Sequence, residues 1–362
     1  MTDSAQIVRV DLGPRSYEIE IDAGNLTAAG RFVGDRAPAD HAVVITDEHV
    51  EKPHAVTVAE SLAESLSRID LLVVEPGEPA KSIETATALW ERLLQLGTDR
   101  KSVVVAVGGG VVGDLAGFVA ATFARGLRFV QVPTTLLAQV DSSVGGKVGI
   151  NLPEAKNMVG AFLQPLGVLV DTATLETLAR REYLAGLGEA VKYGVILDAE
   201  LFVYLESHVA ALLARSHEAL GHVIARCCRL KGDVVQQDER EETGLRAVLN
   251  YGHTFAHAFE TLTGYGTLLH GEAVSMGMIC ASRLAERLGR VETGFTARQC
   301  ELLSAFGLPI ASPPLEADQV LRVMSHDKKV EHGHLRFVLP SRMGHCELVE
   351  DVNPDDVCGV IH

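Results

Sequence analysis

Three histidines and one glutamate in the second half of the chain have the types and spacing of metal ligands. His253 and His257 are four residues apart, which would place both imidazoles on one helix face, and His270 begins a further helical pattern. Glu189 and Lys192 share a face of another predicted helix. One carboxylate and two imidazoles that leave a coordination position open are typical of a catalytic divalent-metal site. The spacing does not decide which two histidines bind, and Glu189 could instead pair with Lys192.

A glycine-rich turn in the first half predicts a nucleotide site. An apolar strand pattern at residues 103–107 runs directly into GGGVVGD at residues 108–114, so GxGxxG follows a strand and precedes a helix. Glycines let the backbone approach a diphosphate, and the helix N-terminus favours its charge. The usual acidic residue about 20 positions later is missing, because residues 128–135 contain none. Asp47 or Glu78 could take its place, which predicts a dinucleotide site of different topology. A tight strand–helix turn without a ligand is the alternative.

The elements that must position these residues alternate between strand and helix in the first half. Residues 83–96 repeat apolar side chains with a helical period, and strands are predicted at residues 7–10, 17–21, 41–46, 71–74, 103–107, 129–132 and 168–170. Such alternation implies a mostly parallel sheet. After about residue 171 helical patterns dominate, and only residues 335–339 predict a late strand. We therefore expect an α/β dinucleotide-binding domain at residues 1–173 and a mainly α-helical metal- and substrate-binding domain at residues 174–362.

Length, composition and charge exclude several classes of protein. The chain has 362 residues, of which 47% are hydrophobic, enough for more than one core. No apolar run reaches the roughly 18–20 residues of a membrane span, and the N-terminus lacks a secretory pattern. The six cysteines include no CxxC pair, which favours reduced thiols and a cytoplasmic location. A net charge of −16 argues against a nucleic-acid partner.

At these residues the chain closely resembles the 3-dehydroquinate synthases of the sugar phosphate cyclase family. The resemblance covers nearly the whole chain. It rests on GEPAK at residues 77–81, GGGVVGDLAGF at 108–118, VPTTLLA at 132–138, DSSVGGK at 141–147, GEAVKYG at 188–194, LNYGHT at 249–254, HGEAV at 270–274 and DKK at 327–329. It implies that Glu189, His253 and His270 bind one divalent metal, zinc or cobalt, while His257 becomes a second-sphere or substrate-facing residue.

The resemblance also implies the cofactor and substrate contacts of the chain. NAD would contact Asp47, Glu78, Lys81, Gly109, Gly110, Val111, Val112, Gly113, Asp114, Thr134, Thr135, Lys147, Lys156, Thr174 and Thr177. A phosphorylated heptulosonate would contact Asp141, Lys147, Asn157, Lys192, Lys231, Arg246, Asn250, His257, Lys328 and Lys329. Among these, Lys231 and Arg246 would hold its carboxylate. In the implied homodimer, Arg125 would reach the neighbouring subunit's site.

The implied activity is a phosphate-eliminating lyase reaction of the shikimate pathway, on the route to chorismate and the aromatic amino acids. It converts 3-deoxy-D-arabino-heptulosonate 7-phosphate to 3-dehydroquinate and phosphate by transient oxidation with NAD, elimination, re-reduction, ring opening and aldol cyclisation. Two alternatives are another sugar phosphate cyclase and a metal-dependent polyol dehydrogenase of the same architecture. The cations in the glycine-rich segments suit a phosphorylated acid better than a simple alcohol.

Overall fold

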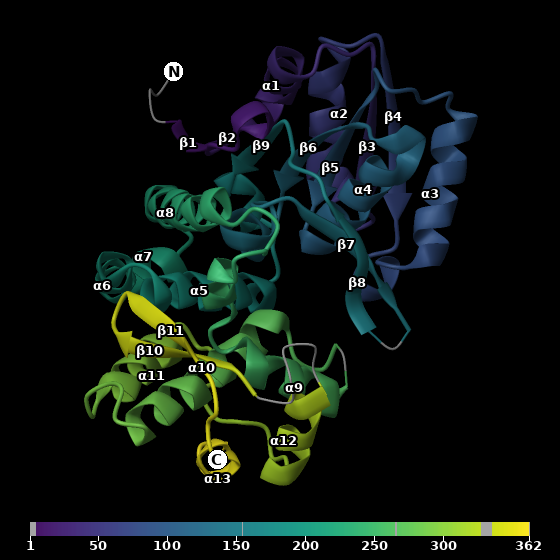
Figure 1. The fold of residues 1–362 in the computed structure, drawn as a ribbon. Helices are drawn as coiled ribbons and strands as arrows, with labels where there is room; N and C mark the ends of the chain where they lie inside the picture. The colour runs from purple at the N-terminus through teal and green to yellow at the C-terminus, as the bar shows by residue number, and fades with distance from the viewer. Residues whose placement is uncertain (1–4, 154, 265, 327–334, 362) are drawn as a thin grey trace. The chain divides into compact units, whose positions relative to one another are not determined.

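The computed structural model describes residues 5–153, 155–264, 266–326 and 335–361, and the chain divides into two compact units (Figure 1). The first unit comprises Met1–Ala179 and His217–Arg240, and the second comprises Arg180–Ser216 and Glu241–His362. This division differs from a single boundary after residue 173, because a segment from the helical half returns to the first unit.

The first unit is built on a seven-stranded sheet in the order β1-β2-β9-β6-β5-β3-β4. The pairing of β1 with β2 is antiparallel, and the other neighbours are parallel, so the expected mostly parallel sheet is confirmed. The strands are β1 (Gln6–Val10), β2 (Tyr17–Asp22), β3 (His41–Asp47), β4 (Arg68–Val74), β5 (Val103–Gly108), β6 (Arg128–Pro133) and β9 (Gly167–Asp171).

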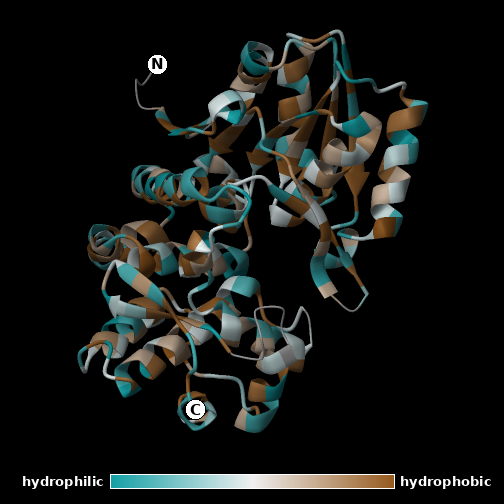
Figure 2. Ribbon diagram, viewed as in Figure 1, coloured by the Kyte–Doolittle hydropathy of each residue, from teal (hydrophilic) through white to brown (hydrophobic). Residues whose placement is uncertain are grey.

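Two hydrophobic cores lie on opposite faces of this sheet. On β5, Val103 and Val105 join the core formed with α1 (Ala29–Arg36) and α2 (Val56–Ala63), whereas Val104 and Ala106 join the core formed with α3 (Ile83–Gln95) and α4 (Gly110–Thr122). Because successive side chains of a strand point to opposite faces, a strand covered on both sides is apolar throughout. Figure 2 shows this as hydrophobic colour along the central strands.

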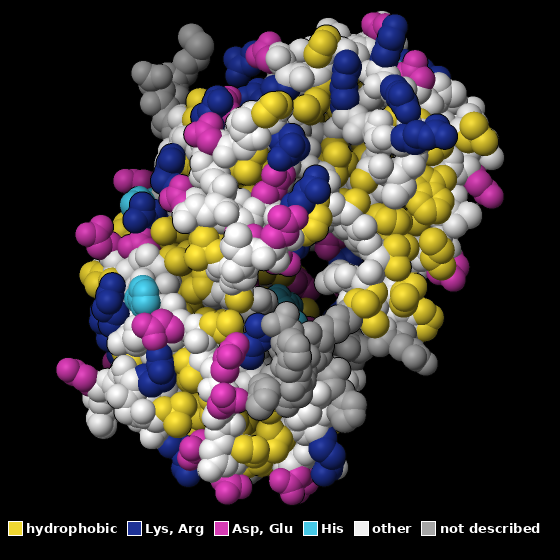
Figure 3. Space-filling view, in the orientation of Figure 1, with side chains coloured by type: hydrophobic (Ala, Val, Ile, Leu, Met, Phe, Trp, Pro, Cys, Tyr) yellow, Lys and Arg dark blue, Asp and Glu magenta, His cyan; other side chains and the backbone are white. Residues whose placement is uncertain are grey.

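A small antiparallel hairpin, β7 (Lys147–Leu152) with β8 (Ala155–Phe162), extends from the first unit and was not among the predicted strands. The backbone amide of Asn151 donates to the carbonyl of Lys81 at 2.8 Å, which ties the hairpin to the loop after β4. Several of its side chains are exposed, and Figure 3 shows hydrophobic side chains grouped over the face that carries α3 and this hairpin.

Helix α8 (His217–Gln237) explains why the first unit takes a segment from the second half of the sequence. A β-carbon added at Gly232 would lie 3.3 Å from the Val10 side chain of β1, so the helix lies close against the antiparallel strand pair. The thiol of Cys228 donates to the carbonyl of Gln139 at 3.2 Å in the short helix η6 (Ala138–Ser142). Helix α8 therefore belongs to the first unit because it packs against β1 and η6, although its neighbours in the sequence belong to the second unit.

The second unit is mainly helical, as expected. It contains α5 (Arg180–Ile196), α6 (Ala199–Ser207), α7 (Val209–Leu213), η8 (Leu245–Asn250), α9 (His253–Thr263), α10 (His270–Arg287), α11 (Phe295–Ala305), α12 (Ala317–His326) and α13 (Pro354–Cys358). The predicted late strand is β10 (Phe337–Arg342), and its antiparallel partner β11 (His345–Val349) was missed. No helix in the described ranges combines the length and apolar character needed to cross a membrane.

Candidate functional site

The metal-ligand candidates of the second unit sit on helices that approach each other closely. Glu189 lies in α5 and His270 is the first residue of α10. A β-carbon added at Gly188 would lie 2.9 Å from the carbonyl oxygen of Gly271, so only a residue without a side chain allows this approach. Because each glycine neighbours a ligand candidate, the contact between the helices sets the separation of Glu189 and His270.

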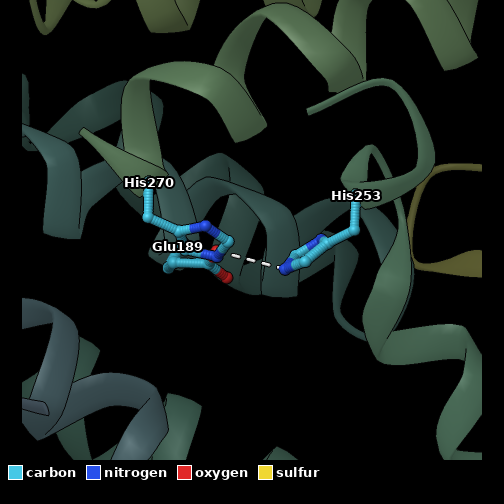
Figure 4. Close-up of side chains that lie close together, drawn as sticks. All are labelled: Glu189, His253 and His270. Atoms are coloured by element: carbon cyan, nitrogen blue, oxygen red, sulfur yellow. Dashed lines mark ion pairs between the residues drawn. The ribbon is translucent and has the colours of Figure 1, made fainter. Parts of the chain in front are cut away.

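Glu189, His253 and His270 form a compact cluster in which one donor atom from each lies within 4.8 Å of the others. The Nε2 atoms of His253 and His270 are 3.7 Å and 3.5 Å from Oε1 of Glu189, and Figure 4 shows both rings turned toward the carboxylate. The exposed fraction of the side chain is 1% for Glu189, 12% for His253 and 34% for His270. The cluster thus has a buried carboxylate, Glu189, and is most accessible to solvent at His270.

This cluster fits a divalent cation. Oε1 of Glu189 is buried and has no hydrogen-bond donor within the described ranges, and a buried carboxylate oxygen without a partner is costly. The ammonium of Lys192 lies 2.5 Å from Oε2 of the same carboxylate, so the salt bridge and the metal set coexist on opposite oxygens. One carboxylate and two imidazoles are a donor set that zinc or cobalt accepts.

His257 lies beside this cluster and is not a member of it. Its ring centroid is 5.7 Å from that of His253 and 6.3 Å from that of His270. The spacing of four residues along α9 made His253 and His257 equally good ligand candidates. Tertiary packing favours His270 as the second imidazole, because α10 begins next to the Glu189 carboxylate.

Glu260 is a buried carboxylate at this site that the sequence analysis did not select. Its Oε2 is 3.7 Å from Nδ1 of His270, and 8% of its side chain is exposed. Burial lowers the pKa of His270, but the Glu260 and Glu189 carboxylates outweigh burial and leave that pKa raised. A signal existed in the sequence, since Glu260 follows His257 by three residues and therefore shares its helix face.

The glycine turn of the first unit joins β5 to α4, as predicted. A β-carbon added at Gly109 would lie 2.9 Å from the Thr135 methyl group, so the backbone approaches the segment after β6 closely. The amide of Thr134 donates to the carbonyl of Gly108 at 2.9 Å. The Thr134 hydroxyl is buried and has no hydrogen-bond partner within the described part of the chain. The turn therefore presents glycine backbone and a hydroxyl at the carboxyl ends of parallel strands, where nucleotides bind in such sheets.

Lys81 connects three separate segments near this turn. Its Nζ donates to Oδ2 of Asp114 at 2.8 Å and to Oδ1 of Asn157 at 2.6 Å, although only 4% of the lysine is exposed. Burial raises the pKa of Asp114 against the opposing effect of Lys81. Oε1 of Glu78 accepts a hydrogen bond from the side-chain amide of Asn151 at 2.7 Å. The fold thus brings together residues expected to contact NAD and one expected to contact the substrate.

Asp141 and Lys231 are paired although 90 residues separate them in the sequence. Nζ of Lys231 donates to the carbonyl of Asp141 at 2.8 Å and lies 3.1 Å from its Oδ2. Asp141 belongs to η6 and Lys231 to α8, so both are in the first unit. Arg246, the other expected carboxylate-binding residue, is buried in η8 of the second unit, with its Nε 3.6 Å from Oε1 of Glu241.

The remaining candidates fall at defined places in the fold. Oδ1 of Asp47 accepts from the amides of His49 and Val50, so that carboxylate caps the turn after β3. Lys328 and Lys329 lie outside the described residues. The first unit places Lys147 on β7, Lys156 on β8, Arg125 in the short helix η5 (Phe123–Arg125), and Thr174 and Thr177 in or just after η7 (Thr172–Glu176), whereas Asn250 ends η8 in the second unit.

Solved sugar phosphate cyclases share the fold of this chain, a mostly parallel sheet with a glycine turn and a mainly helical second unit. A solved 2-deoxy-scyllo-inosose synthase, in complex with carbaglucose-6-phosphate, NAD+ and Co2+, is 28% identical with a TM-score of 0.89, covering 98% of this chain and 99% of its own. The 2-epi-5-epi-valiolone synthase of Streptomyces hygroscopicus, with NAD+ and Zn2+ bound, is 28% identical with a TM-score of 0.87, covering 95% of each chain.

The sequence comparisons are more specific. A family model for the N-terminal part of 3-dehydroquinate synthase matches residues 71–185, and one for the C-terminal part matches residues 186–330. The 3-dehydroquinate synthase of Rhodopirellula baltica is 49% identical over 367 aligned positions, which cover 100% of this chain and 98% of that protein. The chain belongs to the 3-dehydroquinate synthase family.

Proposed function

We propose that this protein converts 3-deoxy-D-arabino-heptulosonate 7-phosphate to 3-dehydroquinate and phosphate. This is an NAD- and metal-dependent lyase reaction of the shikimate pathway, which supplies chorismate and the aromatic amino acids. The observation that carries the proposal is the buried Glu189–His253–His270 cluster in a chain that belongs to this family over its length.

Two bound groups would supply the redox and electrophilic chemistry of this reaction. NAD supplies a hydride acceptor that later returns the hydride, and a zinc or cobalt ion supplies a Lewis acid. The chain's own part is to hold them. Glu189, His253 and His270 would hold the metal, and the glycine turn with α4 would hold the NAD diphosphate. NAD would also be contacted by Asp47, Glu78, Lys81, Asp114, Thr134, Thr135, Lys147, Lys156, Thr174 and Thr177.

The substrate carries a carboxylate and a phosphate, and both need cationic or hydrogen-bonding partners. Lys231 and Arg246 would bind the carboxylate, because guanidinium and ammonium groups form charge-assisted hydrogen bonds with it. Each of these side chains now lies near an acid, Asp141 and Glu241, so binding the substrate requires sharing or exchange of these partners. Phosphate would be held by Lys147, Asn157, Asn250, His257, Lys328 and Lys329.

We further propose a cytoplasmic homodimer with no nucleic-acid partner. The net charge of −16 supports the absence of a nucleic-acid partner, because phosphate backbones repel an acidic surface. Arg125 is accessible to a second subunit. It is exposed, and its φ of 65° lies in the left-handed region, so the loop after α4 holds this cation in an uncommon conformation. That cation would act in the neighbouring subunit's site.

Phosphate release in the presence of catalytic NAD tests the proposed reaction directly. Protein stripped with a chelator and reloaded with Zn2+ or Co2+ should release one phosphate per heptulosonate phosphate consumed, without accumulation of NADH absorbance. A polyol dehydrogenase would accumulate NADH from a simple alcohol, and a different cyclase would consume glucose 6-phosphate or a heptulose phosphate that lacks the carboxylate. Either result would overturn the assignment.

A further inference from the structure

The two histidines of the metal cluster differ in what their second ring nitrogen contacts. Nδ1 of His253 lies 3.1 Å from the carbonyl oxygen of Tyr251, which can only accept a hydrogen bond. Nδ1 therefore carries the ring proton, and the unprotonated Nε2 is the atom that can bind a metal. Tyr251 is itself held by its hydroxyl, which donates to Oε1 of Gln299 at 2.9 Å. A neutral, rigid acceptor therefore orients His253.

His270 has a carboxylate in the corresponding position. Oε2 of Glu260 is 3.7 Å from Nδ1 of His270, while Nε2 of the same ring faces Glu189 at 3.5 Å. The two carboxylates thus lie on opposite sides of one imidazole. Glu260 faces Nδ1, away from the donor atoms that converge on Glu189, so it is not a fourth ligand of this cluster.

We propose that Glu260 is a positioning residue that accepts the Nδ1 proton of His270 and thereby directs Nε2 to the metal. This inference rests on the proposed metal site. The separation of 3.7 Å exceeds a hydrogen bond, so the proposal requires the His270 ring to rotate toward Glu260 when the metal binds. A carboxylate behind a histidine ligand fixes its tautomer and makes the ring a stronger donor.

The place of Glu260 in the fold supports a dedicated role. It follows His253 by seven residues, two turns along α9, so one helix carries a ligand of the metal and the carboxylate that orients another. It is also buried, with 8% of its side chain exposed. A buried carboxylate is expensive unless it is paired with a charged or hydrogen-bonding group. Contact with a protonated ring nitrogen is one pairing that offsets this cost.

The affinity for Co2+ measures this role without relying on turnover. We would titrate wild-type protein, Glu260→Gln and Glu260→Ala with Co2+ against a competing chelator and follow the visible absorption of the ion. Loss of the carboxylate should weaken Co2+ binding by about 10- to 100-fold. Glu286→Gln is the matched control, because it removes the same charge from α10, where Glu286 accepts the Thr296 amide at 2.8 Å and is not one of the cluster residues. Its affinity should equal that of the wild type.

A second control separates this inference from the metal site itself. Glu189→Ala should abolish tight Co2+ binding, and wild-type affinity in that variant would show that the site is misplaced. If Glu189→Ala loses Co2+ while Glu260→Gln and Glu260→Ala bind it within about twofold of the wild type, the role of Glu260 is wrong.

The tautomer of His270 in the wild-type protein gives a second test, which reads the protonation of each ring nitrogen directly. Long-range proton–nitrogen correlation spectra of zinc-loaded protein with labelled histidine should show a protonated Nδ1 and a metal-bound Nε2 for His270. The resonances are assigned by their absence in His270→Gln. Metal bound through Nδ1 would overturn the proposal.

Discussion

Gly271 of α10 lies directly against the carbonyl oxygen of Ala185 in α5, so closely that an added β-carbon would be 1.9 Å from that oxygen. Neither residue has a functional group, yet their contact lets the start of α10 approach α5. His270 precedes Gly271, and Glu189 is one helical turn beyond Ala185. The geometry of the metal cluster therefore depends on a contact between two backbones.

Gly271→Ala should force the two helices apart and weaken both folding and metal binding. Overpacking of this kind costs about 1–3 kcal/mol, measured as the free energy of unfolding in urea, and bound zinc after dialysis should fall with it. Gly34→Ala is the control, since Gly34 lies in α1 with nothing within 4 Å of an added β-carbon. That variant should be more stable by about 0.5–1 kcal/mol. If the Gly271→Ala variant were as stable as the wild type, the close contact between Gly271 and the Ala185 carbonyl oxygen would be wrong.

Substitution of each histidine should distinguish a ligand from a neighbour. His270→Ala should lose bound zinc and phosphate release together, because two donors no longer define a tight site. His257→Ala should keep its zinc after dialysis and lose turnover, since it is outside the cluster and is proposed to bind substrate phosphate. Metal analysis paired with the phosphate assay reads both effects. Full activity in a metal-free His270→Ala protein would contradict the metal assignment.

Lys81→Met should weaken NAD binding and destabilise the first unit. The substitution removes the ammonium paired with Asp114, whose side chain is 24% exposed. We expect a loss of about 1–3 kcal/mol in unfolding free energy, below the range for a fully buried pair. Calorimetry should show NAD affinity reduced by about tenfold or more, the loss of one charge-assisted contact.

The double variant Lys81→Met with Asp114→Asn separates these two effects. It removes the unpaired charge, so stability should recover while NAD affinity stays low. Recovery of both quantities would mean that Lys81 only stabilises Asp114 and does not contact NAD.

His54 should make the stability of the protein depend on pH. Burial lowers its pKa, and the opposing effects of Asp171 and of the Pro53 backbone only partly compensate. Its Nε2 lies 2.8 Å from the Thr177 hydroxyl. Because the folded pKa is below the unfolded value, the stability contributed by neutral His54 is fully present above pH 6.5 and is lost as the pH falls through the folded pKa.

Unfolding in urea at several pH values measures this contribution. The wild-type free energy of unfolding should rise between about pH 5 and pH 7, and His54→Gln should reduce that slope. The exposed His49→Gln variant is the control and should keep the wild-type slope. Equal slopes in wild type and His54→Gln would contradict a buried, neutral imidazole.

Arg125 can be tested by mixing two inactive subunits. If its guanidinium acts in the partner's site, Arg125→Ala and His270→Ala homodimers are both inactive. A mixed dimer regains one site, because the Arg125→Ala subunit keeps its metal and receives an intact arginine from the other. Random assortment of co-expressed chains should restore about a quarter of wild-type phosphate release. Absence of recovery, with dimers seen by sedimentation, would place Arg125 outside the neighbouring site.

The sequence indicated much of the first unit because parallel strands covered on both faces are apolar throughout. The strand from Val103 to the glycine turn is an example, since every residue of β5 is buried. The β7–β8 hairpin escaped prediction because no residue of β8 is fully buried. Val159 and Ala161 pack partly buried against the core, but the neighbouring apolar residues Met158 and Phe162 are exposed, so the sequence shows no clear alternation of apolar and polar side chains. Strand β11 was missed for the same reason, because only Cys346 of its residues is buried.

The chemical types at the site were also determined by the sequence. A carboxylate, several imidazoles and a glycine turn between a strand and a helix indicate a metal and a dinucleotide. The sequence alone did not decide whether His257 or His270 belongs to the metal cluster. It also did not show that Lys231 pairs with Asp141, or that Glu260 lies beside His270. Each of these depends on contacts between segments far apart in the chain. Local periodicity reports the face on which a side chain lies, but only packing of helix against helix decides which faces meet.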